Sequence, residues 1–573
     1  MPPLNDRDVK LRATLRWALR VFILTLAAVM AWSTRFTLDP DGMSYIDVAR
    51  CYLRGDWTNA LSTYWSPLYP WLLTLVFGVG KPGPEWVIPL THAVCWFEFL
   101  GMVLAWEWLQ REWEAWKGAP REWALIDAAG YLLIGWTGLD LAGVDFNSAD
   151  DAVIFFLLLT AALLTRIWRE ADTRRDWITL GIVLAFGFYA KAAFSTVIPV
   201  ILILLFWKRK PAALTAAAAL CLTLLPFVIP ASLTKGRFAL SDTGKMNYAW
   251  QVSGYGVEGY KEEGFPAPAN IPHPIPHLLE SPRVISFTDH MVGTTPVHFD
   301  PLWWCAGYPA NINWERQWMV LRANIPETLS EFRWCPALWL TALLLPFGLR
   351  RFQLGSAWFL WLPALAMSGS YCFVYVLSRY TAGPFMLFGF GLLAACWNIE
   401  LPRWTRLAGI AVLLASAWFS LSTEWDEGVM AAWKEFRGLE RADDAYMVDV
   451  CLYMQHQGFQ PGDRIGLIGM TLGVQYLQLL EGQESAAVPA RLYHIDNEWG
   501  RPLRFTWEKI DEFWAADEST KRRVYNAMRS TGAKWVFASQ VPKWADTTGW
   551  TPIIEEKILR EEPVKQILYY RRL

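Results

Sequence analysis

The stretch WALRVFILTLAAVMAWSTRFTLDPDGMSYIDVARCYLRGDW (residues 17–57) begins with an apolar run, residues 17–32, and then turns polar. The run is long enough to cross a membrane as a helix, and we interpret it as an uncleaved anchor rather than a cleaved signal peptide. Two carboxylates, Asp39 and Asp41, follow almost at once. The basic residues before the run are Arg7, Lys10, Arg12 and Arg16. The positive-inside rule therefore predicts a cytoplasmic N-terminus and places both aspartates on the outer side.

The composition is that of a membrane protein with a sizeable soluble part. Of 573 residues, 54% are hydrophobic and 18% are charged, and the 36 Trp exceed ordinary usage. Aromatic side chains are favoured at membrane interfaces, whereas a mean hydropathy of +0.19 is low for spanning helices alone. The net charge of -2 gives no argument for a nucleic-acid partner. Eight cysteines without a CxxC pair argue against a zinc ribbon or a thioredoxin-like site.

Apolar runs recur along the first three quarters of the chain and predict about eleven spanning helices. The predicted spans are residues 14–33, 84–108, 123–143, 151–168, 177–190, 193–207, 213–232, 334–349, 355–376, 381–397 and 405–421. The shorter run 66–80 is interpreted as a juxtamembrane helix, with full spanning as the alternative. Alternate loops are rich in Lys and Arg, which fixes the expected orientation. The predicted outer segments are residues 34–65, 145–150 and 233–332 and the chain after about 422.

The end of the chain has a different pattern. A short strand is expected at 464–468 and another within 531–540, with the polar helix WEKIDEFWAADESTKRRVYNAMR (507–529) before the second. Alternating helix and strand predicts a small α/β domain. We therefore expect a transmembrane domain over 1–424 and an extracytoplasmic α/β domain over 425–573. The formal GxGxxG match GVGKPG (78–83) follows an apolar helix rather than a strand, so we do not interpret it as a nucleotide site.

Ionisable residues collect at the predicted outer ends of the spans, where they are costly to place. They are Asp39, Asp41, Asp145, Asp150, Asp151, Lys191 and Arg379. Any one of them could be an ordinary residue at a helix end. As a set at one membrane depth, carboxylates beside cations suit a substrate that carries a phosphate and a hydroxyl.

The DPD triplet (39–41) has three interpretations. Asp41 could cap a helix that starts near Met43, the pair could hold a divalent cation such as Mn²⁺ or Mg²⁺, or Asp41 could act as a general base. We assign no metal-ligating residue. Downstream, the positions of Ile46, Ala49 and Leu53 form one apolar helical face, which predicts a helix lying on the membrane surface.

Several segments together resemble the GT-C glycosyltransferases of the protein O-mannosyltransferase and aminoarabinose transferase type. They are DGMSYIDVARCYLRGDW (41–57), YWSPLYPWLLTL (64–75), FNSADDAVIFFLLLTAALL (146–164), GIVLAFGFYAKAAFSTVIPVILIL (181–204) and SRYTAGPFMLFGFGLL (378–393). The resemblance covers roughly residues 10 to 420, and it lies in the order and membrane sides of the segments rather than in any one motif. It implies a multi-pass inner-membrane enzyme that uses a polyprenyl-phosphate-linked sugar.

The resemblance implies roles for individual residues. The catalytic aspartate of the family falls on Asp41, with Asp39 as the alternative, and the family's second acidic position falls on Asp150 or Asp151. Lys191 and Arg379 match basic positions near the lipid phosphate. Tyr45 and Tyr380 are further substrate-binding candidates.

The implied reaction is transfer of a sugar to an acceptor hydroxyl on a lipid, glycan or protein, at the outer face and with inversion. One departure from the family pattern is Gly42, which stands where an Asp-Glu motif would place a second carboxylate. The outer segment 233–332 and the α/β tail are not standard family parts, so they are the candidates for acceptor choice. A glycosidase, a lipid or sugar transporter and a non-catalytic scaffold are the alternatives.

Three features in or next to the large outer segment could have other roles. Its histidines are His273, His277, His290 and His298, and we expect surface or packing roles for them rather than a metal site. The run HFDPLWWCAGY (298–308) could be a sugar-stacking platform or the core of the loop, and core is favoured. Cys305 and Cys335 lie on the predicted oxidising side, where a disulfide is a minority expectation.

Overall fold

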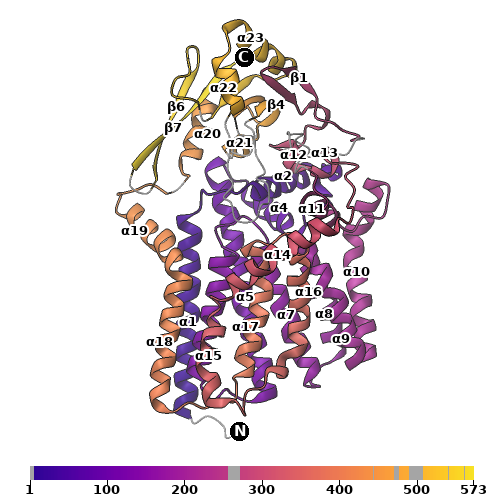
Figure 1. Ribbon diagram of the computed structural model, residues 1–573, viewed down its shortest axis with the longest axis vertical. Coiled ribbons are helices and arrows are strands. Elements are labelled where there is room, and N and C mark those ends of the chain that lie inside the picture. Colours follow the sequence, from indigo (N-terminus) through magenta and orange to yellow (C-terminus); the bar gives the residue numbers. More distant parts are fainter. Residues whose placement is uncertain are drawn as a thin grey trace.

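The computed structural model describes residues 6–255, 271–442, 444–469, 476–489, 508–539, 541–559 and 562–573. Long helices stand side by side in one half of the molecule, and a β-sheet lies beyond their far end (Figure 1). The N-terminus is at the bundle end and the C-terminus at the sheet end. Short helices lie between the bundle and the sheet.

Each predicted span coincides with a helix of the bundle. These are α1 (Asp6–Ser33), α5 (Pro84–Lys117), α6 (Trp123–Gly135), α7 (Asp150–Trp168), α8 (Arg174–Ala190), α9 (Val197–Lys208), α10 (Lys210–Lys235), α15 (Pro336–Gly348), α16 (Trp358–Cys372), α17 (Ser378–Ala395) and α18 (Arg403–Glu424). Within the described residues, six helical stretches are long and apolar enough to cross a membrane, and the other bundle helices are shorter or more polar. On α10, Leu214, Leu222 and Leu233 are exposed, as a lipid-facing helix requires. The chain is a polytopic helical membrane protein.

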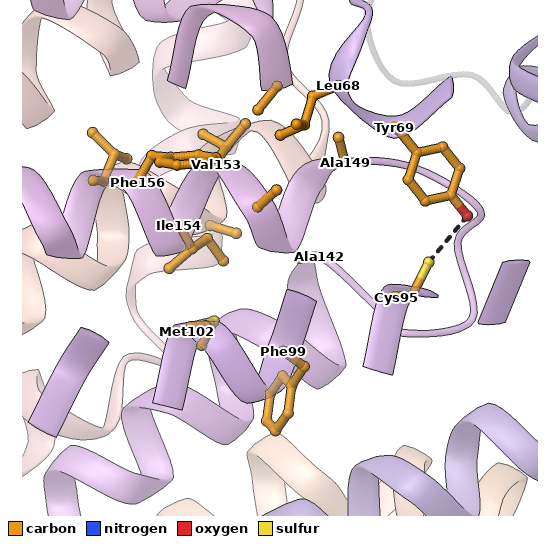
Figure 2. Close-up of a cluster of buried hydrophobic side chains, with 14 of the residues drawn as sticks. Leu68, Tyr69, Cys95, Phe99, Met102, Ala142, Ala149, Val153, Ile154 and Phe156 are labelled. Atoms are coloured by element: carbon orange, nitrogen blue, oxygen red, sulfur yellow. Dashed lines mark hydrogen bonds between the residues drawn. The ribbon is translucent and has the colours of Figure 1, made fainter. Parts of the chain in front are cut away.

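The run 66–80 forms α4 (Leu68–Gly80), a helix of 13 residues. Helix α4 packs against α5 and α8, and its Leu68 and Tyr69 belong to the cluster shown in Figure 2. There the Tyr69 hydroxyl lies 3.4 Å from the Cys95 sulfur, and Phe99 and Val153 are buried nearby. One side of the helix is thus buried in the protein, whereas Leu75 and Val79 are exposed.

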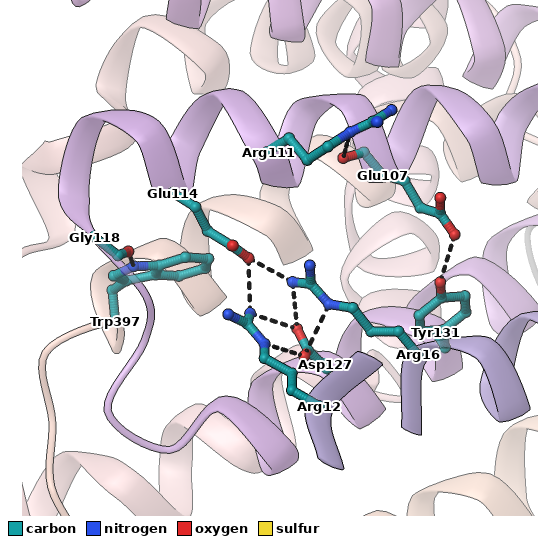
Figure 3. A network of polar contacts seen from close by, with 9 residues as sticks. All are labelled: Arg12, Arg16, Glu107, Arg111, Glu114, Gly118, Asp127, Tyr131 and Trp397. Atoms are coloured by element: carbon teal, nitrogen blue, oxygen red, sulfur yellow. Dashed lines mark hydrogen bonds and ion pairs between the residues drawn. The ribbon is translucent and has the colours of Figure 1, made fainter. Parts of the chain in front are cut away.

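At the end of the bundle away from the sheet, ion pairs connect neighbouring helices (Figure 3). Arg12 donates to Asp127 at 2.7 Å and to Glu114 at 2.7 Å, and Arg16 donates to the same two carboxylates. Arg12 and Asp127 are both buried, so the network joins α1 to α5 and α6 inside the protein. Arg12 and Arg16, two of the residues from which the orientation was predicted, therefore also connect helices of the bundle.

The strands form one sheet of order β1-β2-β4-β3-β5-β7-β6 within the described residues. Its strands are β1 (His277–Glu280), β2 (Arg283–Ser286), β3 (Arg464–Gly469), β4 (Gln483–Pro489), β5 (Trp535–Ala538), β6 (Thr551–Leu559) and β7 (Glu562–Arg572). Strands β4, β3 and β5 are parallel, and the outer pairs are antiparallel. The two expected strands are β3 and β5. The expected polar helix is two helices, α22 (Glu508–Ala515) and α23 (Glu518–Ser530).

The hairpin β1-β2 was not expected from the sequence. It belongs to the large outer segment between α10 and α15, yet β2 pairs with β4, with Ile285 opposite Ala487. The outer segment therefore completes the edge of the C-terminal sheet. The two regions meet in one sheet rather than standing as separate lobes.

Candidate active site

Helix α2 (Pro40–Arg54) carries the first candidate residue, and its ends have clear local causes. The Asp39 side chain accepts from the Gly42 amide at 2.9 Å, Pro40 occupies the first turn, and Gly55 ends the helix at φ 73°. The expected helix start near Met43 is thus too late, and the expected capping role falls on Asp39, not on Asp41. Asp41 lies in the first turn with its carboxylate available for other contacts.

The apolar face of α2 is turned into the protein. Ile46 and Ala49 are fully buried, and only Leu53 is exposed. Helix α4 packs beside α2. The expectation that this face lies on the membrane surface is therefore wrong, because periodicity identifies an apolar face but not what covers it.

Arg379, at the start of α17, lies close to three of the predicted aspartates. Its guanidinium lies 2.5 Å from Asp41 Oδ2, 3.6 Å from Asp39 Oδ2 and 4.0 Å from Asp150 Oδ2. The side chain is only 13% exposed. Residues from the first outer loop, from α7 and from α17 thus meet around one cation.

A second ion pair lies beside the first. Lys191, between α8 and the short helix η2 (Ala192–Thr196), donates to Asp150, which also accepts from the Ser148 hydroxyl at 2.8 Å. The Lys191 ammonium lies 4.0 Å from the centre of the Tyr380 ring, a cation–π contact. Tyr380 in turn stacks on Tyr371. Asp150, Lys191, Arg379 and Tyr380 therefore form one connected polar group.

The two aspartates of the DPD triplet have opposite pKa shifts. Burial, followed by the neighbouring charge of Asp41, raises the pKa of Asp39 to about 7. Burial opposes ionisation of Asp41 as well, but Arg379 and His298 outweigh it and lower the pKa of Asp41. At neutral pH Asp41 is therefore the ionised carboxylate of the pair, which is the state that a general base needs.

A cavity of about 380 Å³ opens on this group. Of the predicted residues, the ones that line it are Asp41, Tyr45, Asp150, Lys191, Arg379 and Tyr380. Asp39 lies behind Asp41 as the helix cap and does not line the cavity. Asp151 does not line it either, and its carboxylate is buried without a hydrogen-bond partner among the described residues. The structure therefore distinguishes Asp150, which faces the cavity, from Asp151, which does not.

Two residues of the large outer segment were not selected from the sequence. The Nε2 atom of His298, in α12 (Pro296–Phe299), lies 3.7 Å from Asp41 Oδ1, and its ring meets Trp65 edge-on. Lys245, in α11 (Thr243–Gln251), lines the cavity and has no carboxylate within ion-pair distance among the described residues. No sequence signal separated His298 from the other three histidines. His290, in contrast, has a packing role, because it pairs with Asp300 at 3.0 Å and stacks on Trp303.

The space around Gly42 explains its departure from the family pattern. A Cβ atom at this position would lie 2.6 Å from Asn147 Cβ and 2.7 Å from Asp39 Oδ1. No side chain fits there without movement of the loop that precedes α7. A second carboxylate after Asp41 is therefore sterically excluded in this chain.

The DPD pair does not have the arrangement of a metal site, since one guanidinium contacts both carboxylates. Across the described ranges, no group of three or more His, Cys, Asp and Glu is placed to hold a metal ion. Cys305 and Cys335 are both described and both buried, and no disulfide joins them, so that minority expectation is wrong.

No protein-family model and no curated protein sequence matches the chain. The structure is similar to that of ArnT from Cupriavidus metallidurans bound to undecaprenyl phosphate, with a TM-score of 0.50 and 12% identity over 96% of this chain and 97% of that chain. The apo state of the same protein gives a TM-score of 0.48 at 12% identity, over 97% and 98% of the two chains. The oligosaccharyltransferase of Archaeoglobus fulgidus, in complex with Zn and sulfate, gives 0.42 at 11% identity, over 92% of this chain and 68% of that chain.

The likeness to ArnT in its lipid-bound state covers nearly the whole of both chains and establishes the fold. The chain is thus a polytopic membrane protein. Its fold is that of the GT-C class, with a sheet-containing C-terminal region.

Proposed function

We propose that the protein is a membrane glycosyltransferase that moves a sugar from a polyprenyl-phosphate-linked donor to an acceptor hydroxyl, with inversion at the anomeric carbon. The observation that carries the proposal is the cavity in which ionised Asp41 lies beside Arg379 and Lys191. The GT-C fold makes a lipid-linked sugar the expected donor class. The ArnT structure with undecaprenyl phosphate supports a lipid phosphate of this kind, as an analogy in fold.

The proposed reaction is a single displacement. Asp41 takes the proton of the acceptor hydroxyl while the acceptor oxygen bonds to the anomeric carbon, and the bond from that carbon to the phosphate oxygen breaks. The lipid phosphate leaves already ionised, so no general acid is required. Arg379 suits contact with phosphate because its planar fork can donate two hydrogen bonds.

The ion pairs at the site have to rearrange when the donor binds. Arg379 and Lys191 are paired with Asp41 and Asp150, so a phosphate has to compete with carboxylates for them. Asp39 reduces this competition when it is protonated, as its raised pKa allows. Lys245 adds a cation at the cavity, and within the described part of the chain no carboxylate lies within ion-pair distance of it. In this scheme the phosphate draws Arg379 away from Asp41 and leaves Asp41 free to accept a proton.

The proposal is tested by lipid analysis and by an activity assay on purified protein. Mass spectrometry of co-purified lipids should detect a polyprenyl phosphate, with or without a sugar. The protein should also release polyprenyl phosphate when it is given a polyprenyl-phosphate sugar and an extract of envelope acceptors. An Asp41→Asn variant that binds the lipid without releasing it is the matched control. Failure of the wild-type protein both to bind and to turn over any such lipid would overturn the proposal.

The proposed location is the inner membrane, with the sheet region on the periplasmic side. A fusion of alkaline phosphatase to the C-terminus is then expected to be active, and a fusion of green fluorescent protein at the same point to be dark. The physical reason is the bias of Lys and Arg toward alternate loops. The same two reporters fused at Arg350 serve as the control and should give the opposite result, because the span 334–349 leads from the outer segment 233–332 to the predicted cytoplasmic side, where Arg350 and Arg351 lie. Fluorescence from the C-terminal fusion would contradict this orientation.

A further inference from the structure

A buried hydrogen-bond junction holds the second half of α2. Asp47, two helical turns beyond Asp41, is only 5% exposed. One of its oxygens accepts from the Thr294 amide at 2.6 Å, and the other accepts from the Gln478 amide nitrogen at 2.9 Å. Thr294 belongs to the large outer segment and Gln478 to α21 (Tyr476–Leu480) of the C-terminal region. Three distant parts of the chain thus meet at one carboxylate.

Gln478 is the centre of this junction. Its side chain is fully buried, its nitrogen also donates to the Met43 carbonyl at 3.2 Å, and its Oε1 accepts from the Thr294 hydroxyl. Its backbone carbonyl accepts from Arg50 at 2.7 Å. The C-terminal region therefore contacts α2 at successive turns through a single glutamine.

The same outer segment continues from this junction to Asp41. Thr294 holds Asp47, and four residues later His298 lies 3.7 Å from Asp41 Oδ1. Trp65 donates to the Phe299 carbonyl at 2.8 Å and fixes the end of α12. The segment therefore lies along α2 and contacts it at the two carboxylates. A shift of Thr294 relative to α2 would change the separation of His298 and Asp41.

We propose that the junction of Asp47, Thr294 and Gln478 positions Asp41 and His298 for catalysis, so that the C-terminal region completes the active site. Gln478, Thr294 and Asp47 are positioning residues, because none of them lines the cavity. This proposal rests on the glycosyltransferase function proposed above and adds a role for the C-terminal region within it. That region is then required for turnover even where it does not touch the acceptor.

The test uses full-length variants that exchange the donor and the acceptor of the hydrogen bond between Gln478 and Asp47. Asp47→Asn places an amide against the Gln478 amide, and Gln478→Glu places a carboxylate against Asp47. Each single variant is expected to lower kcat by a factor on the order of ten or more, with the KM for the lipid-linked donor unchanged. The double variant Asp47→Asn/Gln478→Glu restores one donor and one acceptor between the two side chains, and it moves the carboxylate to position 478, whose backbone carbonyl Arg50 contacts. The Met43 carbonyl still lacks the donor that Gln478 supplied, so the double variant should recover part of the lost kcat.

A matched control separates positioning from loss of stability. Ser485→Ala removes buried hydrogen bonds to the Ile465 carbonyl and Thr531 inside the C-terminal sheet, without touching α2. It should lower the melting temperature but leave kcat per folded molecule unchanged. A fall in kcat equal to that of the junction variants, or no recovery in the double variant, would overturn the positioning role.

Hydrogen exchange supplies a readout that does not depend on activity. Amides of residues 40–54 should exchange faster in Gln478→Ala than in the wild-type protein and in Ser485→Ala, because α2 loses the side-chain hydrogen bonds of Gln478 to Met43 and Asp47. Unchanged protection of α2 would overturn the proposal even if the enzyme's donor were never found. An inactive wild-type protein with the expected exchange pattern would instead count against the proposed function alone.

Discussion

Replacing Asp41 with Asn is expected to lower kcat by a factor on the order of 10² or more, while the protein still folds and binds the lipid-linked donor. Asn has the size of Asp but cannot accept the proton of the acceptor hydroxyl. The helix itself should be undisturbed, because its cap is Asp39. Single-turnover rates with saturating donor measure the effect, and donor titration shows whether binding is preserved.

Asp39→Asn is the matched control, since the change is chemically the same and two residues away. Asn caps helices about as well as Asp, and Asp39 does not line the cavity. The variant should therefore keep turnover within a few fold of the wild-type value. Normal turnover in both variants would refute the first-loop base, whereas normal turnover in Asp41→Asn with an inactive Asp39→Asn would move the base to Asp39. Equal loss in both, reversed by added Mn²⁺ or Mg²⁺, would indicate a metal shared by the pair.

The part of the site that could be predicted is the part fixed by membrane depth. Asp41, Asp150, Lys191 and Arg379 come from distant segments, but each lies at the outer end of a predicted span. Topology alone therefore brought them to one level of the membrane, and the structure brings them into contact. Depth could not separate Asp150 from Asp151, because adjacent residues of a helix share a level and differ only in the direction they face.

The parts that were missed depend on tertiary contacts of the outer segment. His298 and Lys245 reach the cavity only because the chain between α10 and α15 folds back over α2. The hairpin β1-β2 finds its partner strand β4 some two hundred residues later. The N-cap of α2, in contrast, could have been assigned from the sequence, because Asp39 followed by Pro40 is a recognisable helix start.

The expectation for Arg379 follows from its three carboxylate neighbours. Arg379→Ala removes the cation that Asp39 and Asp41 share, while Asp150 keeps its ion pair with Lys191. Removing one partner of a buried ion pair typically costs about 3–5 kcal/mol. The variant should therefore melt at a clearly lower temperature than the wild-type protein, and it should lose both donor binding and turnover. Thermal unfolding in detergent and donor titration measure the two effects.

Arg379→Lys separates the geometric role from the charge. A lysine keeps the positive charge at the outer end of α17, but a single ammonium cannot reproduce the two parallel hydrogen bonds that the planar fork of Arg379 can donate to a phosphate. We expect near-normal melting, and donor affinity weaker by roughly tenfold, the cost of about one hydrogen bond to a charged group. Arg35→Lys is the matched control, because Arg35 makes a similar two-pronged contact with Glu435 away from the cavity. Full activity and unchanged donor affinity in Arg379→Lys would show that Arg379 acts only as an interfacial charge, and that the donor phosphate is held by other cations such as Lys191 and Lys245.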